Sequence, residues 1–203
     1  MNKDGLKRHY SFLQKIKLLY FLIRTKFLDK NIRLIRFPIV LRGKKYIEFG
    51  HNLTTGYWCR FEVFPQDKQP YKRIILGNNI QINDFVHISA INHVKIGDNC
   101  LLASHIYISD NSHGLYTGSI KDSTPDIPPV NREYITNPVN IGSNCWIGEG
   151  VIILPGVSIG SGCVIGAHSV VNKDIPNNTI AVGSPAKIIK KYNFKTKCWE
   201  KTI

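Results

Sequence analysis

His113 is the residue of this chain whose position best suits acid–base chemistry. It belongs to the segment Asp110-Asn111-Ser112-His113-Gly114, at the point where a regular pattern of apolar residues breaks off. An imidazole can accept and return a proton near neutral pH, which makes histidine the commonest general base. We therefore predict that His113 is a catalytic base, and that Asp110 either orients His113 or caps the local turn.

For three of the other histidines in the same pattern, the position also allows a prediction. His93 holds the place that corresponds to His113 one repeat earlier. We expect it to stack beneath His113, where it would help to bind a substrate. His105 and His168 fall where turns are expected, and we predict no chemical role for them.

A six-residue period of apolar residues organises the middle of the chain and must position these side chains. An aliphatic residue opens every sixth position from Ile141 onward, and the same phase recurs in shorter blocks before it. Amphipathic helices repeat near 3.6 residues and simple strands at 2, so neither accounts for this period. A short strand followed by a turn does, and three such units close one coil. Stacked coils would form parallel sheets around an apolar core.

The same period assigns the cysteines. Cys59, Cys100, Cys145 and Cys163 all fall four residues after an opening position, which predicts that their side chains point inward. A thiol nucleophile or a metal ligand is the alternative, but small buried hydrophobic residues are the commoner use of cysteine. We therefore expect no metal site and no covalent enzyme intermediate, and we assign no role to Cys198.

The period is interrupted once, over residues of about 114–138 that are rich in Pro, Ser, Thr and Asp. A loop of more than about 15 residues in a compact domain is usually functional or disordered. We expect this one to leave the coil directly after His113.

These features resemble the hexapeptide-repeat acyltransferases, and in particular the O-acetyltransferases of bacterial O-antigens and capsules. The resemblance is carried by the segment from Ile82 to Gly114 with its D-x-x-H-G motif, by Trp146-Ile147-Gly148 and by the ending Pro185-Ala186-Lys187. It implies an all-β fold, a left-handed parallel β-helix over residues 47–186. A basic, helical N-terminal segment (1–46) would precede it, and a basic C-terminal helix or tail (187–203) would follow.

The resemblance also implies a homotrimer that binds acetyl-CoA in a groove between subunits. Trp146 would flank the pantetheine arm, or alternatively pack at the subunit interface. Backbone groups near Gly148 and Ala167 would bind the pantetheine amides, and Asn83 would contact the acceptor sugar unless it only forms a turn. The phosphates would face three lysines that are otherwise solvated surface residues: Lys173, Lys187 and Lys190.

The net charge of +13 is concentrated at the two ends of the chain. Residues 1–46 hold 13 Lys and Arg against 2 acids, whereas residues 47–186 hold 8 against 11. A nucleic-acid-binding surface would be expected to spread its basic residues over the fold, so we expect no nucleic-acid partner.

The apolar residues of segment 6–28 recur at helical spacing among several Lys and Arg. One interpretation is a helix that packs over the open end of the coil, and this is the one we favour. The other is an interfacial helix, within residues 1–30, on an anionic membrane. No apolar run approaches the roughly 20 residues of a membrane span and no secretory signal is evident, so we expect a cytoplasmic protein, peripheral to the inner membrane face under the second interpretation.

The sequence therefore predicts an acetyl-CoA-dependent O-acetyltransferase that modifies a sugar hydroxyl of a bacterial surface polysaccharide or its precursor. Three alternatives remain at this point. They are an N-acetyltransferase of an amino sugar, a zinc hydratase on the same fold, and a non-catalytic scaffold. The histidine spacings do not match the hydratase, and the base at His113 argues against a scaffold.

Overall fold

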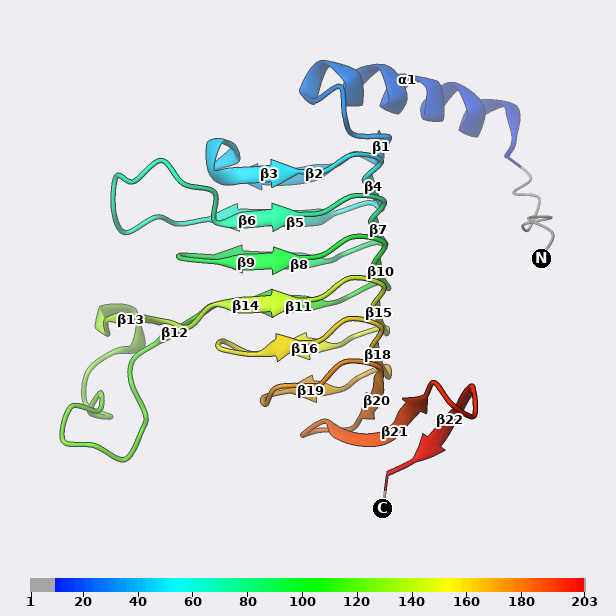
Figure 1. Ribbon diagram of the computed structural model, residues 1–203. Coiled ribbons are helices and arrows are strands. Elements are labelled where there is room, and N and C mark those ends of the chain that lie inside the picture. The colour runs from blue at the N-terminus through cyan, green and yellow to red at the C-terminus, as the bar shows by residue number, and fades with distance from the viewer. Residues whose placement is uncertain (1–9, 203) are drawn as a thin grey trace.

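The computed structural model describes residues 10–202, and three sheets form the walls of a parallel β-helix (Figure 1). The nine-stranded sheet contains β1 (Leu34–Ile35), β4 (Thr54–Thr55), β7 (Gln81–Ile82), β10 (Leu101–Leu102), β15 (Trp146–Ile147), β18 (Val164–Ile165), β20 (Thr179–Val182), β21 (Lys187–Asn193) and β22 (Cys198–Lys201). The six-stranded sheet contains β2 (Ile39–Arg42), β5 (Cys59–Val63), β8 (His87–Ala90), β11 (Tyr107–Ser109), β16 (Ile152–Ile153) and β19 (Val170–Val171). The five-stranded sheet contains β3 (Ile47–Phe49), β6 (Ile74–Leu76), β9 (Val94–Ile96), β14 (Val139–Ile141) and β17 (Ser158–Ile159). Outside these walls lie helix α1 (Phe12–Leu28), the pair β12 (Asn111–His113) and β13 (Tyr134–Thr136), and short 3₁₀ helices at Lys44–Tyr46 and Pro129–Asn131.

The opening residues of the repeat point inward and stack in continuous columns. In the nine-stranded sheet Ile82, Leu102, Ile147 and Ile165 follow one another in register, and each is at most 1% exposed. Full burial of one such side chain contributes about 1.5–3 kcal/mol. The six-residue period therefore specifies the β-helix by placing one inward side chain, usually a large aliphatic one, on each wall of each coil.

The corners between walls use residues that tolerate left-handed backbone. Asn52, Asn79 and Asn99 have φ values of 61°, 56° and 57°, and their side chains form a ladder of hydrogen bonds from coil to coil. Asparagine adopts this conformation at low cost. His105 and His168 occupy corners of the same kind, with φ of 59° and 56°, which confirms that they are turn residues.

The first coil begins before the predicted boundary at residue 47. β1 pairs in parallel with β4, and β2 with β5, so residues 34–42 already belong to the walls. The basic composition of this segment concealed its strands, because Arg33 and Arg42 lie on the outside while Ile32 and Ile35 are fully buried.

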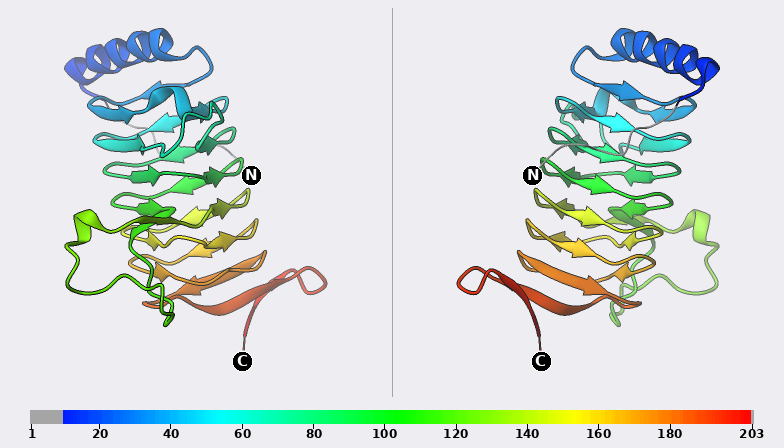
Figure 2. Two further views of the ribbon diagram at one scale, coloured as in Figure 1. Left: turned by 90° about the vertical axis from the view of Figure 1, so that its left-hand side faces the viewer. Right: turned by 90° about the vertical axis from the view of Figure 1, so that its right-hand side faces the viewer.

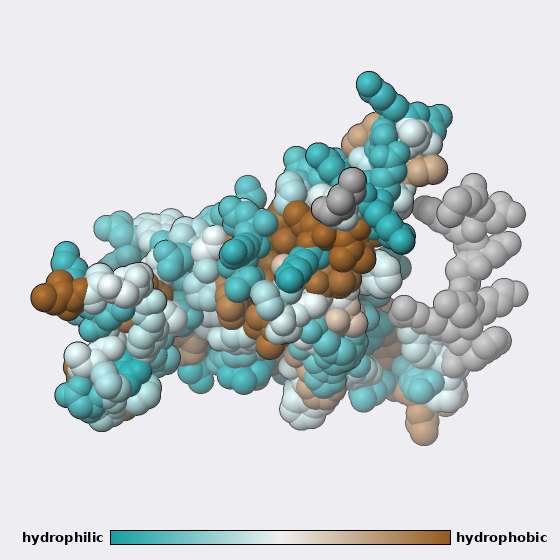
Figure 3. Space-filling view, turned by 90° about the horizontal axis from the view of Figure 1, so that it is seen from below, coloured by the Kyte–Doolittle hydropathy of each residue, from teal (hydrophilic) through white to brown (hydrophobic). Residues whose placement is uncertain are grey.

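Of the predicted C-terminal helix or tail, the helix is wrong, because residues 187–201 form the antiparallel strands β21 and β22. β21 pairs with β20, the last parallel strand of its sheet. Figure 3 shows this end of the molecule, with apolar surface gathered near its centre and hydrophilic residues around it. The hairpin therefore covers a sheet edge that the last coil would otherwise leave open.

Helix α1 covers the opposite end of the β-helix (Figures 1 and 2). Phe21 packs against Phe37 and Tyr57, with ring centroids 5.7 and 5.9 Å apart. The Thr25 hydroxyl accepts a hydrogen bond of 2.8 Å from the backbone N–H of Ile35 in the edge strand β1. The predicted packing over the first coil is confirmed. The helix also accepts a hydrogen bond from a backbone N–H of the edge strand that could otherwise pair with another strand.

The long loop leaves the wall after Asp110 and returns at Asn137, which is three residues earlier than predicted at its start. The N–H of Asn137 donates to the carbonyl of Asp110 at 2.8 Å and closes the base of the loop. β12 and β13 are its two antiparallel arms, and the loop projects from the side of the β-helix (Figure 2).

We predict that only Cys198 of the native chain reacts rapidly with a thiol reagent at pH 8. The four repeat cysteines are buried as predicted, and only Cys198 is exposed. Burial raises the pKa of Cys59 to about 11, and a hydrogen bond with Cys100 raises that of Cys145 to about 11. Because the thiolate is the reactive form, titration with Ellman's reagent should give one fast thiol per chain, and the remainder only after denaturation. Rapid reaction of a second thiol in the folded protein would contradict the inward orientation.

Candidate active site

His113 ends strand β12 and projects from the loop arm with its ring exposed. The ring packs against Tyr134 of β13, with centroids 4.5 Å apart, and its Nδ1 lies 3.1 Å from the carbonyl oxygen of Pro129. A carbonyl oxygen only accepts hydrogen bonds, so this contact requires the ring hydrogen on Nδ1. The lone pair is then on Nε2, which is the arrangement a general base needs.

The loop itself holds the backbone of His113 in place. The Tyr116 hydroxyl donates to the carbonyl of His113 at 2.6 Å. The Arg132 guanidinium in turn donates to the Tyr116 hydroxyl at 2.6 Å and to the carbonyl of Ile127 at 2.8 Å. The predicted base is thus fixed by residues of its own loop, none of which the sequence indicated.

Asp110 does not orient His113, and this part of the prediction needs correction. Its side chain is fully buried and accepts hydrogen bonds from the backbone N–H groups of Ile91, Asn92 and His93 at 2.6–2.9 Å. The side-chain amide of Asn111 donates to the same carboxylate at 3.0 Å. Asp110 therefore anchors the base of the loop to the corner of the preceding coil.

His93 does not stack beneath His113. Val94 pairs with Val139, so the residue above His93 is the end of the loop, not His113. The His93 Nε2 lies 3.2 Å from Oδ1 of Asn140 on the neighbouring coil. The six-residue count could not show this, because the loop is inserted between β11 and β14. The residue that stacks on His93 therefore comes after the loop, whereas His113 lies within it.

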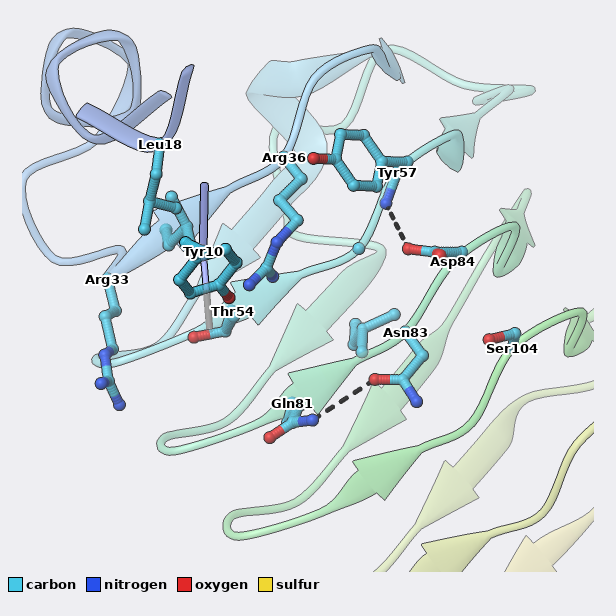
Figure 4. Close-up of a pocket in the computed structure, with 13 residues that line it drawn as sticks. Tyr10, Leu18, Arg33, Arg36, Thr54, Tyr57, Gln81, Asn83, Asp84 and Ser104 are labelled. Atoms are coloured by element: carbon cyan, nitrogen blue, oxygen red, sulfur yellow. Dashed lines mark hydrogen bonds between the residues drawn. The ribbon is translucent and has the colours of Figure 1, made fainter. Parts of the chain in front are cut away.

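Asn83 lines a cavity of about 690 Å³ between α1 and the edge of the nine-stranded sheet (Figure 4). Its Oδ1 accepts a hydrogen bond of 3.3 Å from Gln81. Arg36 and Tyr57 also face the cavity, and Arg36 is held by the carbonyl of Thr55 at 3.0 Å. Aromatic, amide and guanidinium groups together suit a polar ligand such as a sugar. Sequence reasoning found only Asn83 among these residues.

Within one chain Asn83 and His113 lie on different sides of the β-helix. Asn83 follows β7 of the nine-stranded sheet, whereas His113 belongs to the arm that leaves from the six-stranded sheet (Figure 1). A single chain therefore does not bring the two predicted residues together.

Most of the residues predicted to bind the donor lie along the C-terminal half of the nine-stranded sheet. Trp146 begins β15 and is 53% exposed. The Gly148 N–H is already bonded to the carbonyl of Ile165 at 2.8 Å, so it cannot bind a ligand amide. The exposed Ala167 N–H, in contrast, has no acceptor among residues 10–202.

The three lysines of the prediction separate into two locations. Lys187 and Lys190 both belong to β21, opposite Val182 and Ile180 of β20. Lys173 follows β19 of the six-stranded sheet, one corner further round the coil. In one chain, only the first two lie on the sheet that carries Trp146.

No three His, Cys, Asp or Glu side chains in the described part of the chain are close enough together to hold a metal ion. None of the helices within residues 10–202 is long and apolar enough to cross a membrane.

Comparison with known proteins identifies the family. The family model described as bacterial transferase hexapeptide (six repeats) matches residues 138–173. WbbJ of Escherichia coli (strain K12), whose name assigns it provisionally to lipopolysaccharide biosynthesis as an O-acetyl transferase, is 43% identical over 196 residues, which is 97% of each chain. The chain belongs to the hexapeptide-repeat transferase family. This confirms the predicted family and makes the protein an acyltransferase.

Two solved structures show the same architecture. A hexapeptide-repeat acetyltransferase of Vibrio cholerae, complexed with acetyl coenzyme A, is 28% identical, with a TM-score of 0.60 over 74% of this chain and 73% of that one. The N-acyltransferase AntD of Bacillus cereus is 23% identical, with a TM-score of 0.68 over 86% and 90% of the two chains. The left-handed parallel β-helix predicted for this hexapeptide-repeat transferase is confirmed.

Proposed function

We propose that this hexapeptide-repeat transferase moves an acetyl group from acetyl-CoA to a sugar hydroxyl of a bacterial surface polysaccharide or its precursor. The observation that carries the proposal is the exposed His113, whose Nδ1 is occupied by a carbonyl so that Nε2 can act as a base. The similarity to WbbJ over 97% of the chain supports hydroxyl acetylation and a role in lipopolysaccharide synthesis.

The chemistry needs only His113 and hydrogen-bond donors. His113 would take the proton of the sugar hydroxyl as that oxygen attacks the thioester carbonyl carbon. The carbon–sulfur bond then breaks, and the imidazolium returns the proton to the departing thiolate. A backbone N–H near the reacting carbonyl would stabilise the oxyanion. The four buried repeat cysteines take no part, which agrees with direct transfer.

We propose a homotrimer, because Asn83 and His113 are separated within one chain. They could act in the same site if that site is formed between neighbouring subunits. The nine-stranded sheet of one subunit, which carries Trp146 and leads into Asn83, would then face the loop arm of the next. Light scattering should give the mass of three chains, and a fully active monomer would contradict this proposal.

The donor site would use Trp146, the free N–H of Ala167 and the lysines of β21. We predict that Lys187→Ala and Lys190→Ala each raise the KM for acetyl-CoA with little change in kcat. Their charges would bind the donor phosphates equally in the ground and transition states, and such a loss raises KM alone. Initial rates at varied acetyl-CoA provide the measurement.

Lys195→Ala is the matched control, since Lys195 is an exposed lysine of the same hairpin beyond β21. It should leave the KM unchanged. An equal effect of all three substitutions would indicate a general charge effect and contradict the assignment.

The experiment that tests the function is NMR of surface glycan from wild-type and deletion strains. We expect an O-acetyl signal to be missing from the mutant glycan, and its position would name the sugar and the hydroxyl. Because the donor is acetyl-CoA, the reaction would take place in the cytoplasm. Loss of an N-acetyl signal instead would show that the acceptor is an amino sugar.

A further inference from the structure

Helix α1 carries a stripe of apolar side chains on the face turned away from the β-helix. Phe27 is 89% exposed and Phe12 is 76% exposed. The other members of the stripe are at least half exposed: Leu13, Ile16, Leu19, Tyr20 and Ile23. Scattered exposed apolar residues are normal, but a contiguous apolar surface of this kind marks an interaction site.

The stripe is opposite the face that packs on the first coil. Phe21 and Thr25 are buried, and Leu18 and Leu28 are partly buried. At 100° per residue these four residues centre on one side of the helix, and the stripe centres on the other. The fold has therefore used one face of α1 to cover the coil and has left a second apolar face unused.

Basic residues border this stripe on both sides. On the helical wheel Lys15 and Lys26 fall on one border, and Lys17 and Arg24 on the other. The helix contains no acidic residue. Near its C-terminal end, a hollow of about 420 Å³ is lined by Leu22, Ile23, Phe27, Lys26 and Lys30. The Lys26 ammonium donates hydrogen bonds to the carbonyls of Lys30 and Ile32.

An apolar face bordered by lysine and arginine is complementary to a leaflet that contains anionic lipids. We propose that α1 binds this hexapeptide-repeat transferase to such a leaflet, with the stripe among the acyl chains and the cations among the lipid headgroups. The hollow has the same chemistry, because its lining combines three apolar side chains with two lysines.

The orientation of the stripe argues against a neighbouring subunit as its partner. The C-terminal part of α1 lies over the end of the β-helix, and its N-terminal part extends beyond the nine-stranded sheet (Figure 1). The stripe lies on the face opposite the coil, so it points away from this end of the β-helix. Subunits that share the site described above lie beside the coil, not beyond its end. Three such subunits with parallel axes would present three stripes on one plane and bind a flat surface multivalently.

This placement sets the distance between the membrane and the site. The strand β10 of the coil that carries the loop is fourth in the sheet after β1, β4 and β7. At about 4.8 Å per strand, that coil lies roughly 15 Å further from the bilayer than the first coil. An acceptor sugar held on a lipid carrier would reach it only when extended from the surface.

The test is flotation of the purified full-length protein with vesicles of phosphatidylcholine alone or with added phosphatidylglycerol. We expect binding to the anionic vesicles that weakens with salt. Leu19→Gln combined with Ile23→Gln should reduce the partition constant at least about tenfold, since both side chains would leave the acyl region. Lys15→Gln should reduce it about fivefold at low salt, as expected for one cation near an anionic surface.

Ile120→Gln is the matched control, because Ile120 is fully exposed. It belongs to the loop between β12 and β13, which lies well away from α1 (Figure 1), so the change should not affect vesicle binding. Melting temperature and acetyl transfer to a soluble acceptor should be unchanged in the Leu19/Ile23 variant. These two readouts separate the membrane proposal from the proposed activity.

Three results would overturn the proposal. The first is that the wild-type protein does not float with anionic vesicles. The second is that the Leu19/Ile23 variant floats as well as the wild-type protein. The third is a larger assembly in solution that the same double substitution dissociates, because a second copy of the protein would then cover the stripe.

Discussion

Replacing His113 by alanine is expected to lower kcat by about 10²–10⁴-fold, the usual contribution of a general base. The contact with Pro129 places the ring hydrogen of His113 on Nδ1 and leaves the lone pair of Nε2 available. The described loop contains no second histidine. Acetyl-CoA binding should persist, because the residues proposed for the donor lie on a different sheet. Steady-state kinetics with saturating acceptor and calorimetric titration of acetyl-CoA measure the two effects.

His51→Ala is the control for that experiment. His51 is exposed at a corner two coils before the coil that carries the loop, and its replacement should leave kcat normal. If His113→Ala retained near-normal turnover with saturating acceptor, another group would be the base and the proposed mechanism would be wrong.

Replacing Asp110 by alanine is expected to destabilise the protein and to lower its activity together. The change removes the acceptor of three backbone N–H groups, of which that of Ile91 is buried and those of Asn92 and His93 are partly buried. Unsatisfied buried donors cost about 1–3 kcal/mol each, so a net loss of roughly 3 kcal/mol is reasonable. That loss corresponds to a fall in Tm of roughly 6–12 °C. Thermal denaturation and kcat on the same samples provide the measurement.

Asp98→Ala is the matched control, because the Asp98 carboxylate accepts a backbone N–H bond from Asn78 at a corner that carries no loop. It should lower the Tm by a smaller amount and leave kcat unchanged. The contrary result is an Asp110→Ala protein with normal Tm and lost activity, which would mean that the carboxylate takes part in the chemistry.

The sequence by itself determined the β-helix, the inward cysteines and the place of the histidine that we propose as the base. Each of these follows from the six-residue period, because in stacked coils a residue's place in the repeat decides which wall it occupies and whether it points inward. The buried column from Ile82 to Ile165 and the buried Cys163 both follow this rule. An interruption of the period is equally visible, and His113 lies at that interruption.

Only the tertiary structure decided how the loop, the two ends and the corners contact one another. The bond from His113 to Pro129 joins residues within a segment that has no period, and Asp110 bonds to a corner that lies one coil earlier. The N-terminal strands and the C-terminal hairpin were hidden by their many basic residues. The apolar spacing of α1 fitted either coil packing or membrane binding, and the structure showed that the helix has one face for the coil and a second face left exposed. A repeat encodes the face on which each residue lies, whereas contacts between non-repeating segments depend on where the chain brings them in space.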